Sequence, residues 1–225
     1  MKETKQVSQL FVVVAVVYVV CLLLSNLVAG KMWAVTESIT LPAAVILFPI
    51  TYIFGDIFTE VYGFRKARFI IWLGFLCSFF AVAVYLLTIA LPHPGYWENQ
   101  SAYAVVLGTT PRVAAASFIG YLFGEFSNSM ILSRLKVRTQ GKKLWARTIL
   151  STLVGEGFDS VIFIMVSFWG TMDNSVVLHM IVYQYLFKVC YEAVFTPLTY
   201  AVVGWLKKKE GVDTYDYDVK YSVIG

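Results

Sequence analysis

The chain has 225 residues, of which 59% are hydrophobic and only 14% are charged, and its formal net charge is +4. Soluble domains carry about 25% charged residues, so this composition excludes a disordered chain, a disulfide scaffold and an ordinary soluble enzyme. It predicts an all-α polytopic membrane protein with a single domain.

Six apolar windows have the length of a membrane-spanning helix, which needs about 20 residues to cross a hydrocarbon core about 30 Å thick. In chain order they are approximately Leu10–Ala29, Pro42–Val61, Phe69–Leu91, Val113–Leu135, Thr148–Trp169 and Val176–Leu206. The last window contains Pro197, which removes a backbone donor and predicts a tilt or a break. The segment Trp33–Leu41 is short and partly polar, and we expect a loop or a brief re-entrant turn.

Basic residues indicate the orientation of these spans. Fifteen of the 18 Lys and Arg residues lie in the N-terminal tail (Lys2 and Lys5), in the loops after the second and fourth windows, and near the C-terminus. Such loops stay in the cytoplasm. We therefore expect a six-helix transmembrane domain over residues 1–206, with both termini cytoplasmic. Residues 207–225 are expected to form an exposed cytoplasmic tail.

Acidic residues inside the windows are the main functional signal. Each charged side chain at the centre of a bilayer costs about 2.5–3.5 kcal/mol, so five would cost about 12–17 kcal/mol if they faced lipid. That sum rivals the whole stability of a typical domain, about 5–15 kcal/mol. These groups must therefore face an interior that pairs, protonates or hydrates them. The five acids are Asp56, Glu125, Glu156, Asp159 and Glu192.

Polar residues spaced by three or four share one face of a helix, and several helices carry such pairs at similar depth. This layout is expected of a solute site near the middle of the membrane. The pairs are Asp56 with Glu60, Glu125 with Asn128, Glu156 with Asp159, and Lys188 with Glu192.

Structural explanations for single residues stay open beside the functional one. Lys188 and Glu192 could simply pair within their own helix, and Glu60 could pair with Arg65 at the interface. Asn26 and Gln184 carry side-chain amides. These amides either form hydrogen bonds between helices or contact a ligand.

Glycine precedes an acid in three windows, as GDIFTE at 55–60, GEFSNS at 124–129 and GEGFDS at 155–160. These glycines either let two helices approach closely or let a ligand reach the backbone.

Motifs for enzymatic chemistry are missing from the sequence. It contains no Gly-x-Ser-x-Gly elbow, no HExxH and no glycine-rich phosphate loop. The segment 155–159 comes close to the Gly-x-Gly-Asp setting of intramembrane aspartyl proteases but misses it by one residue. No cluster of His and Cys has metal-ligand spacing. We therefore expect neither an enzyme nor a metal or other cofactor.

Four long strings resemble the queuosine-precursor transporter family, which is also known as the vitamin uptake transporter family. The most specific is FPITYIFGDIFTEVYGFRKARFIIWLGF at 48–75. The others are RVAAASFIGYLFGEFSNSMI at 112–131, RTILSTLVGEGFDSVIF at 147–163 and KVCYEAVFTPLTY at 188–200. The resemblance implies a bundle of six helices in the cell (inner) membrane, similar to the substrate-binding subunits of energy-coupling-factor importers.

The resemblance also implies a small-molecule substrate of the 7-deazaguanine class: 7-cyano-7-deazaguanine, its aminomethyl relative or queuine, taken up for tRNA modification. One carboxylate can accept both donors of a guanine-like edge, and aromatic rings can stack on the base. We assign Glu156 and Asp159 to the base, with Asp56 and Glu125 completing the pocket. Lys188 and Glu192 are expected to form the opposite wall, and the weaker candidates are Asn26, Asn128 and Gln184.

Partners other than the substrate and the lipid bilayer are limited. We expect no nucleic acid partner, and a homodimer stays open because the sequence shows no interface. The first span, FVVVAVVYVVCLLLSNLVA, lacks an Ala-x-x-x-Ala pattern for docking to a separate ATPase module. This favours an autonomous carrier over a ligand-capture subunit.

Overall fold

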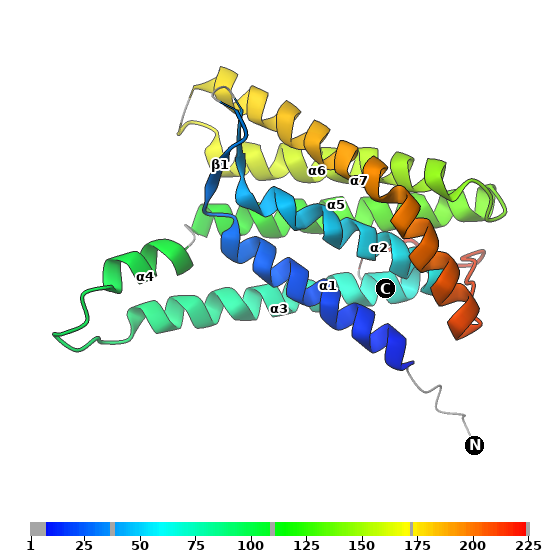
Figure 1. Cartoon of the computed structure of the whole chain (residues 1–225), viewed down its shortest axis with the longest axis horizontal. Coiled ribbons are helices and arrows are strands. Elements are labelled where there is room, and N and C mark those ends of the chain that lie inside the picture. Colours follow the sequence, from blue (N-terminus) through cyan, green and yellow to red (C-terminus); the bar gives the residue numbers. More distant parts are fainter. Residues whose placement is uncertain (1–7, 37–38, 109–110, 172, 224–225) are drawn as a thin grey trace.

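The computed structural model describes residues 8–36, 39–108, 111–171 and 173–223, so the predicted cytoplasmic residues Lys2 and Lys5 lie outside it (Figure 1). The described chain is mostly helical. Its elements are α1 (Gln9–Val28), β1 (Met32–Ala34), β2 (Thr40–Pro42), the 3-10 helix η1 (Ala43–Ile46), α2 (Phe48–Tyr62), α3 (Phe64–Ala90), α4 (Gln100–Leu107), α5 (Pro111–Arg138), α6 (Leu144–Phe168) and α7 (Asn174–Glu210).

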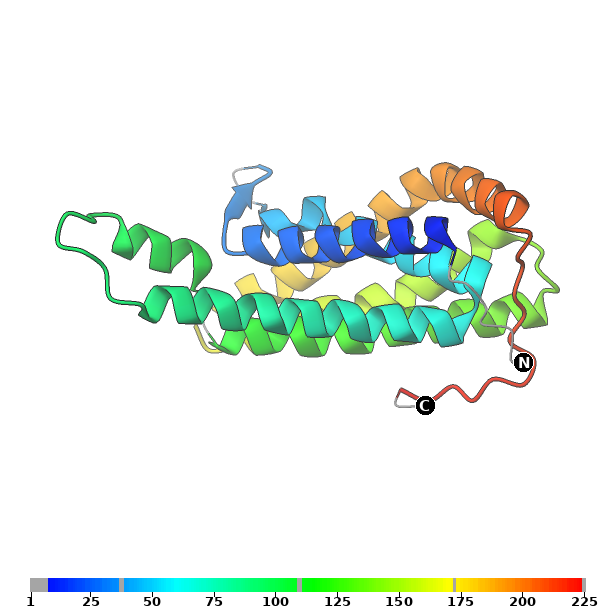
Figure 2. The same ribbon diagram turned by 90° about the horizontal axis from the view of Figure 1, so that it is seen from below.

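Five helical stretches within the described residues are long and apolar enough to cross a membrane. They are α1, α3, α6 and α7, together with a fifth stretch that includes α5. The predicted class, an all-α polytopic membrane protein, is therefore confirmed. α7 stays helical through Pro197 and changes direction in its C-terminal part (Figures 1 and 2), so the predicted alternative of a break is wrong.

α2 differs from the predicted second span. It has 15 residues, which corresponds to a rise of about 22 Å, and β2 and η1 occupy the start of the predicted window. Twelve of its 15 residues are buried, and α1, α3, α5 and α7 pack around it. Because α2 is shielded from lipid on nearly all sides, it can carry polar side chains that a lipid-facing helix could not.

The two faces of α2 contact different surroundings. Toward α1, Phe58 and Tyr62 pack edge-to-face with Phe11, and Phe58 also packs with Tyr18. On its other side, Asp56 accepts a hydrogen bond from α5. The apolar core therefore lies between α1, α2 and α3, and the polar interior lies between α2, α5, α6 and α7.

The bundle has two distinct ends. The start of α1 and the end of α7 meet where Ser8 Oγ donates to Glu210 Oε1 at 2.5 Å, and we call this the tail end. β1 and β2 form an antiparallel hairpin, with Trp33 opposite Leu41, at the opposite end (Figure 1), which we call the hairpin end. The segment predicted as a loop or re-entrant turn therefore contributes to two paired strands, and its residues 37 and 38 lie outside the described residues. α3 and α4 project beyond the other helices (Figure 2).

The segment after α7, predicted to be exposed, packs across the tail end. Asp216 is only 7% exposed, and its Oδ2 accepts hydrogen bonds from the backbone N–H of Phe64 at 2.8 Å and from Ser133 Oγ at 2.6 Å. It thus caps the N-terminus of α3, where the preceding residue, Gly63, has a φ of +85° and a Cβ would lie 2.7 Å from Thr214 Cγ2.

Candidate functional site

The polar interior contains almost all of the predicted site residues. Eight of the nine are at most 3% exposed, and Asn26 is half-buried. None of the five acids faces lipid, which confirms the expectation drawn from the cost of charges in a bilayer. The eight buried residues are Asp56, Glu125, Asn128, Glu156, Asp159, Gln184, Lys188 and Glu192.

Lys188 of α7 is the centre of a buried ion-paired group. Its Nζ lies 2.8 Å from Glu156 Oε2 and also bonds Asp159 Oδ2 of the same helix, α6. The ammonium lies 4.6 Å from the centre of the Phe48 ring, within the range of a cation–π contact. The predicted pairing of Lys188 with Glu192 is therefore wrong, because the lysine side chain reaches across to α6 instead of along its own helix.

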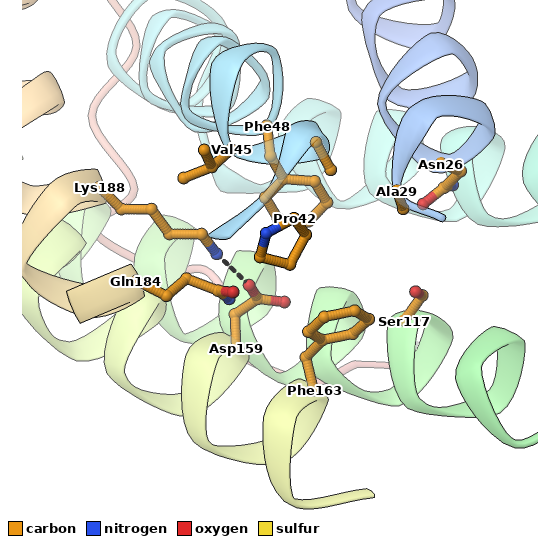
Figure 3. Close-up of a pocket in the computed structure, with 11 residues that line it drawn as sticks. Asn26, Ala29, Pro42, Val45, Phe48, Ser117, Asp159, Phe163, Gln184 and Lys188 are labelled. Carbon is orange, nitrogen blue, oxygen red and sulfur yellow. Dashed lines mark hydrogen bonds and ion pairs between the residues drawn. The ribbon is translucent and has the colours of Figure 1, made fainter. Parts of the chain in front are cut away.

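A pocket adjoins this group (Figure 3). Its enclosed free space is about 30 Å³, enough for about two water molecules and far below the range of about 300–1,000 Å³ for small-molecule sites, so a base-sized ligand requires the surrounding side chains to move. Gln184 and Asp159 lie side by side in its wall (Figure 3). Asn26 lines the far side and also donates to Ser78 Oγ at 3.3 Å, so it joins α1 to α3 as well. The lining residues that matter here are Asn26, Phe48, Asp159, Phe163, Gln184 and Lys188.

The remaining five predicted site residues do not line this pocket. Asn128 Nδ2 donates to Asp56 Oδ1 at 2.7 Å, which links α5 to α2. The carboxylate oxygens of Glu125 and Glu192 have no hydrogen-bond partner within the described part of the chain. The predicted site is thus divided into a pocket wall and a deeper acidic layer.

Glu60 belongs to a third polar group, at the tail end. Arg147 of α6 binds it with two nitrogens, at 2.5 and 3.2 Å, and Lys207 Nζ lies 2.6 Å from the same carboxylate. Lys136 donates to the Glu60 backbone oxygen at 2.5 Å. The predicted pairing with Arg65 is wrong. The sequence pattern predicted these three partners only as loop or tail charges, although a buried acid within one turn of the end of a span needs basic partners of this kind.

Asp213 extends this group beyond α7. Its Oδ1 accepts a hydrogen bond from Lys136 at 2.5 Å and lies 2.9 Å from Lys207 Nζ. Partial burial raises the pKa of the Asp213 carboxyl, but the hydrogen bonds from the two lysines outweigh it and hold that pKa below its usual value. At neutral pH, Asp213 is therefore an ionised partner of both lysines.

Comparisons with known proteins agree with the motifs in the sequence. A family model described as "Putative vitamin uptake transporter" matches residues 42–202. The chain is 29% identical over 157 residues to the "Probable queuosine precursor transporter" of Bacillus subtilis (strain 168), covering 69% of this chain and 68% of that protein. It is 28% identical over 159 residues to the "Queuosine precursor transporter" of Escherichia coli (strain K12), covering 69% of each. No solved structure matches the chain significantly, so the likeness to energy-coupling-factor subunits stays a prediction.

Proposed function

The chain belongs to the vitamin uptake transporter family, and from this membership we propose that it imports queuosine precursors across the cell membrane. The match over residues 42–202 and the names of the two relatives support this proposal. The substrates we propose are 7-deazaguanines: the 7-cyano and 7-aminomethyl compounds or queuine. The polar and aromatic side chains that line the pocket support a small planar substrate.

A carboxylate next to an ammonium group, in the wall of one pocket, is the observation that carries the proposal. The guanine edge presents one carbonyl acceptor followed by two adjacent N–H donors. Asp159 can accept both donors in a bidentate, charge-assisted pair, while Lys188 or Gln184 donates to the carbonyl. Asp159 and Lys188 already bond one another, so a base that inserts its edge would exchange one ion pair for bonds to both partners.

Aromatic and acidic neighbours suit the rest of the base. Phe48 and Phe163 contribute apolar wall to the pocket, and stacking on an aromatic ring contributes about 1–3 kcal/mol per base. Glu156 lies on the other side of the Lys188 ammonium and could pair with a cationic aminomethyl substituent. The assignment of Asp56, Glu125 and the remaining predicted residues to the substrate stays a prediction.

The carrier that we propose works without a separate ATPase. Expression in a host without any energy-coupling module tests this point, because an autonomous carrier would still move the base. Uptake that required a co-expressed ATPase would contradict it.

Replacing one pocket carboxylate gives the first prediction. Asp159→Asn keeps the size of the side chain but removes the acceptor of both guanine donors. Hydrogen bonds to charged groups contribute about 1.5–3 kcal/mol, so apparent affinity should fall about 10- to 150-fold. The measurement is uptake of radiolabelled 7-cyano-7-deazaguanine by cells that cannot synthesise it. Asp173→Asn, an exposed aspartate at the start of α7, is the matched control and should transport normally.

Competition by unlabelled bases tests whether the protein recognises the donor and acceptor pattern of a guanine edge. Excess unlabelled guanine-type bases should reduce uptake, whereas adenine, whose edge has the opposite order of donors and acceptors, should not. Unchanged uptake by a correctly inserted Asp159→Asn variant would contradict the pocket, and absence of uptake by the unaltered protein would contradict the function.

A further inference from the structure

Three buried carboxylates in the deeper acidic layer have no ion-pair partner among the residues that the structure describes. Asp56 of α2, Glu125 of α5 and Glu192 of α7 are each at most 1% exposed, and we call them the carboxylate trio. Among the described residues, five of their six oxygens have no hydrogen-bond partner. The sixth, Asp56 Oδ1, accepts from Asn128 Nδ2 at 2.7 Å.

The members of the trio interact electrostatically although they come from three helices. Each one is within electrostatic range of the other two. The Glu125 carboxylate lies directly against the backbone of Gly55, where a Cβ would be only 2.6 Å from Glu125 Oε2, and Asp56 is the next residue along α2. The trio is therefore one electrostatically linked group and not three independent buried acids.

The basic groups around the trio are already paired. Lys188 binds Glu156 and Asp159, and Arg147 binds both oxygens of Glu60. The titratable and charged groups that face the trio from the surrounding helices are Tyr18 of α1, Tyr52 and Glu60 of α2, Tyr121 of α5, Arg147, Glu156 and Asp159 of α6, and Lys188 of α7.

Full ionisation of the trio is energetically untenable in this setting. A buried ion without a partner costs several kcal/mol even after relaxation, and three of them would match the total stability of a typical protein. Repulsion among three neighbouring carboxylates adds to that cost. Protons remove both penalties, because each proton converts a carboxylate into a neutral carboxyl group that needs no basic partner.

We propose that the carboxylate trio is a proton-binding site and that a proton crosses the membrane with each base. The second part rests on the proposed function. Glu192 is one helical turn from Lys188 toward the tail end, and Asp56 is one turn before Glu60. The trio therefore lies between the substrate pocket and the ion pairs of the tail end. The proton comes from the water on the pocket side, resides on a trio carboxylate and leaves to the water at the tail end, and no other bond is made or broken.

Infrared spectroscopy of the purified protein tests proton binding without any substrate. Exposed acids are ionised at pH 7, so a carbonyl stretch of protonated carboxyl groups at that pH reports buried ones. We expect this band in the unaltered protein, a weaker band in Glu125→Gln, and its loss in the triple variant Asp56→Asn, Glu125→Gln, Glu192→Gln. The exposed Glu98 supplies the matched control, Glu98→Gln, with an unaltered band. Absence of the band in the unaltered protein, or an equal band in the triple variant, would overturn the site.

Proteoliposomes test the coupling. With the membrane potential held at zero and the outside one pH unit more acidic, one proton per base should concentrate radiolabelled 7-cyano-7-deazaguanine about tenfold inside, because a tenfold ratio corresponds to about 1.4 kcal/mol. A protonophore should abolish this accumulation. Glu125→Gln should accumulate less base than the unaltered protein and should lose the dependence of uptake on the pH gradient, whereas Glu98→Gln should behave like the unaltered protein.

The outcomes separate the two proposals. Equilibration of the base without accumulation, accumulation driven by a sodium gradient at equal pH, or normal accumulation by Glu125→Gln would each overturn proton coupling while the transport function stands. If the unaltered protein moves no base, the proposed function and the coupling both fail, and the infrared band still decides whether the trio binds protons.

Discussion

Two glycines let α5 and α6 touch backbone to backbone. A Cβ on Gly155 would lie 2.9 Å from the Gly124 carbonyl oxygen, 2.8 Å from Asn128 Cβ and 3.1 Å from Tyr52 Cε1. A Cβ on Gly124 would lie 3.0 Å from the Gly155 carbonyl oxygen. Of the two roles that the sequence left open for these glycines, close helix approach is the one that the structure shows. This approach helps to bring the acids that follow each glycine into one interior.

Alanine substitutions at two positions of α6 should have opposite effects. Gly155→Ala introduces a methyl group where three neighbours leave no room, and overpacking costs about 1–3 kcal/mol. At Gly157, the nearest atom to a new Cβ is Tyr185 Cε2 at 3.7 Å, so Gly157→Ala should gain about 0.5–1 kcal/mol from the higher helix propensity of alanine.

Thermal unfolding of the two purified variants measures this difference. We expect a lower midpoint for Gly155→Ala and an equal or higher midpoint for Gly157→Ala. A Gly155→Ala variant as stable as Gly157→Ala would show that the two backbones need not touch.

The sequence predicted correctly which charged residues are buried, but it did not predict which of them form ion pairs. The cost of charge in lipid is large enough to predict that Glu156 and Glu192 face inward. Helical spacing shows that Lys188 and Glu192 share a face, but it contains no information about which neighbouring helix that face meets. The partners of Lys188 are on α6, and that choice depends on tertiary packing.

Among the elements, hydropathy predicted the long helices better than it predicted α2. The windows for α1, α3, α5, α6 and α7 match the structure to within a few residues, because each of these helices exposes a broad apolar surface. α2 is buried on nearly all sides, so its length is not set by the thickness of the bilayer. Hydropathy also missed the packed tail, since alternating Asp and Tyr residues at 213–218 have the composition of an exposed segment.

The packed tail gives a prediction for Asp216. Asp216→Ala removes the carboxylate that caps α3 and bonds Ser133, and the loss of such a cap costs about 0.5–2 kcal/mol. Backbone amides over residues 211–223 should then exchange with solvent about 2- to 30-fold faster. Hydrogen exchange followed by mass spectrometry measures this rate.

Asp218, two residues further on, is exposed and provides the control, Asp218→Ala, which should exchange at the original rate. Equal exchange in the two variants would mean that Asp216 does not anchor the tail.

Across the whole molecule, polar groups follow one another from the pocket to the tail end. The pocket with Asp159 and Lys188 comes first, the carboxylate trio follows about one helical turn deeper, and Glu60 with its basic partners comes last. The four helices that carry these groups contact one another in a closed order, because α2 packs against α5 and α7, and α6 packs against the same two helices. The sequence predicted the shared polar interior, but its division into three layers depends on side chains that reach between helices.

The charge distribution predicts which side of the membrane each end faces. The start of α1 and the end of α7 meet at one end, and 15 of the 18 basic residues belong to tails and loops assigned to that side. Short loops rich in Lys and Arg stay in the cytoplasm during insertion. The tail end should therefore be cytoplasmic, and the hairpin end with the loop before α4 should be outside.

Labelling of single cysteines tests this orientation. The three native cysteines are free thiols and would first be replaced by serine. Gly95, in the loop between α3 and α4, and Asp218, in the tail, are both exposed, so neither substitution disturbs a buried contact. A membrane-impermeant maleimide should label Gly95→Cys in intact cells and Asp218→Cys only after permeabilisation. The reverse result would mean that the protein is inserted the other way round, with the pocket facing the cytoplasm. It would contradict both the proposed import and the proposed inward movement of the proton.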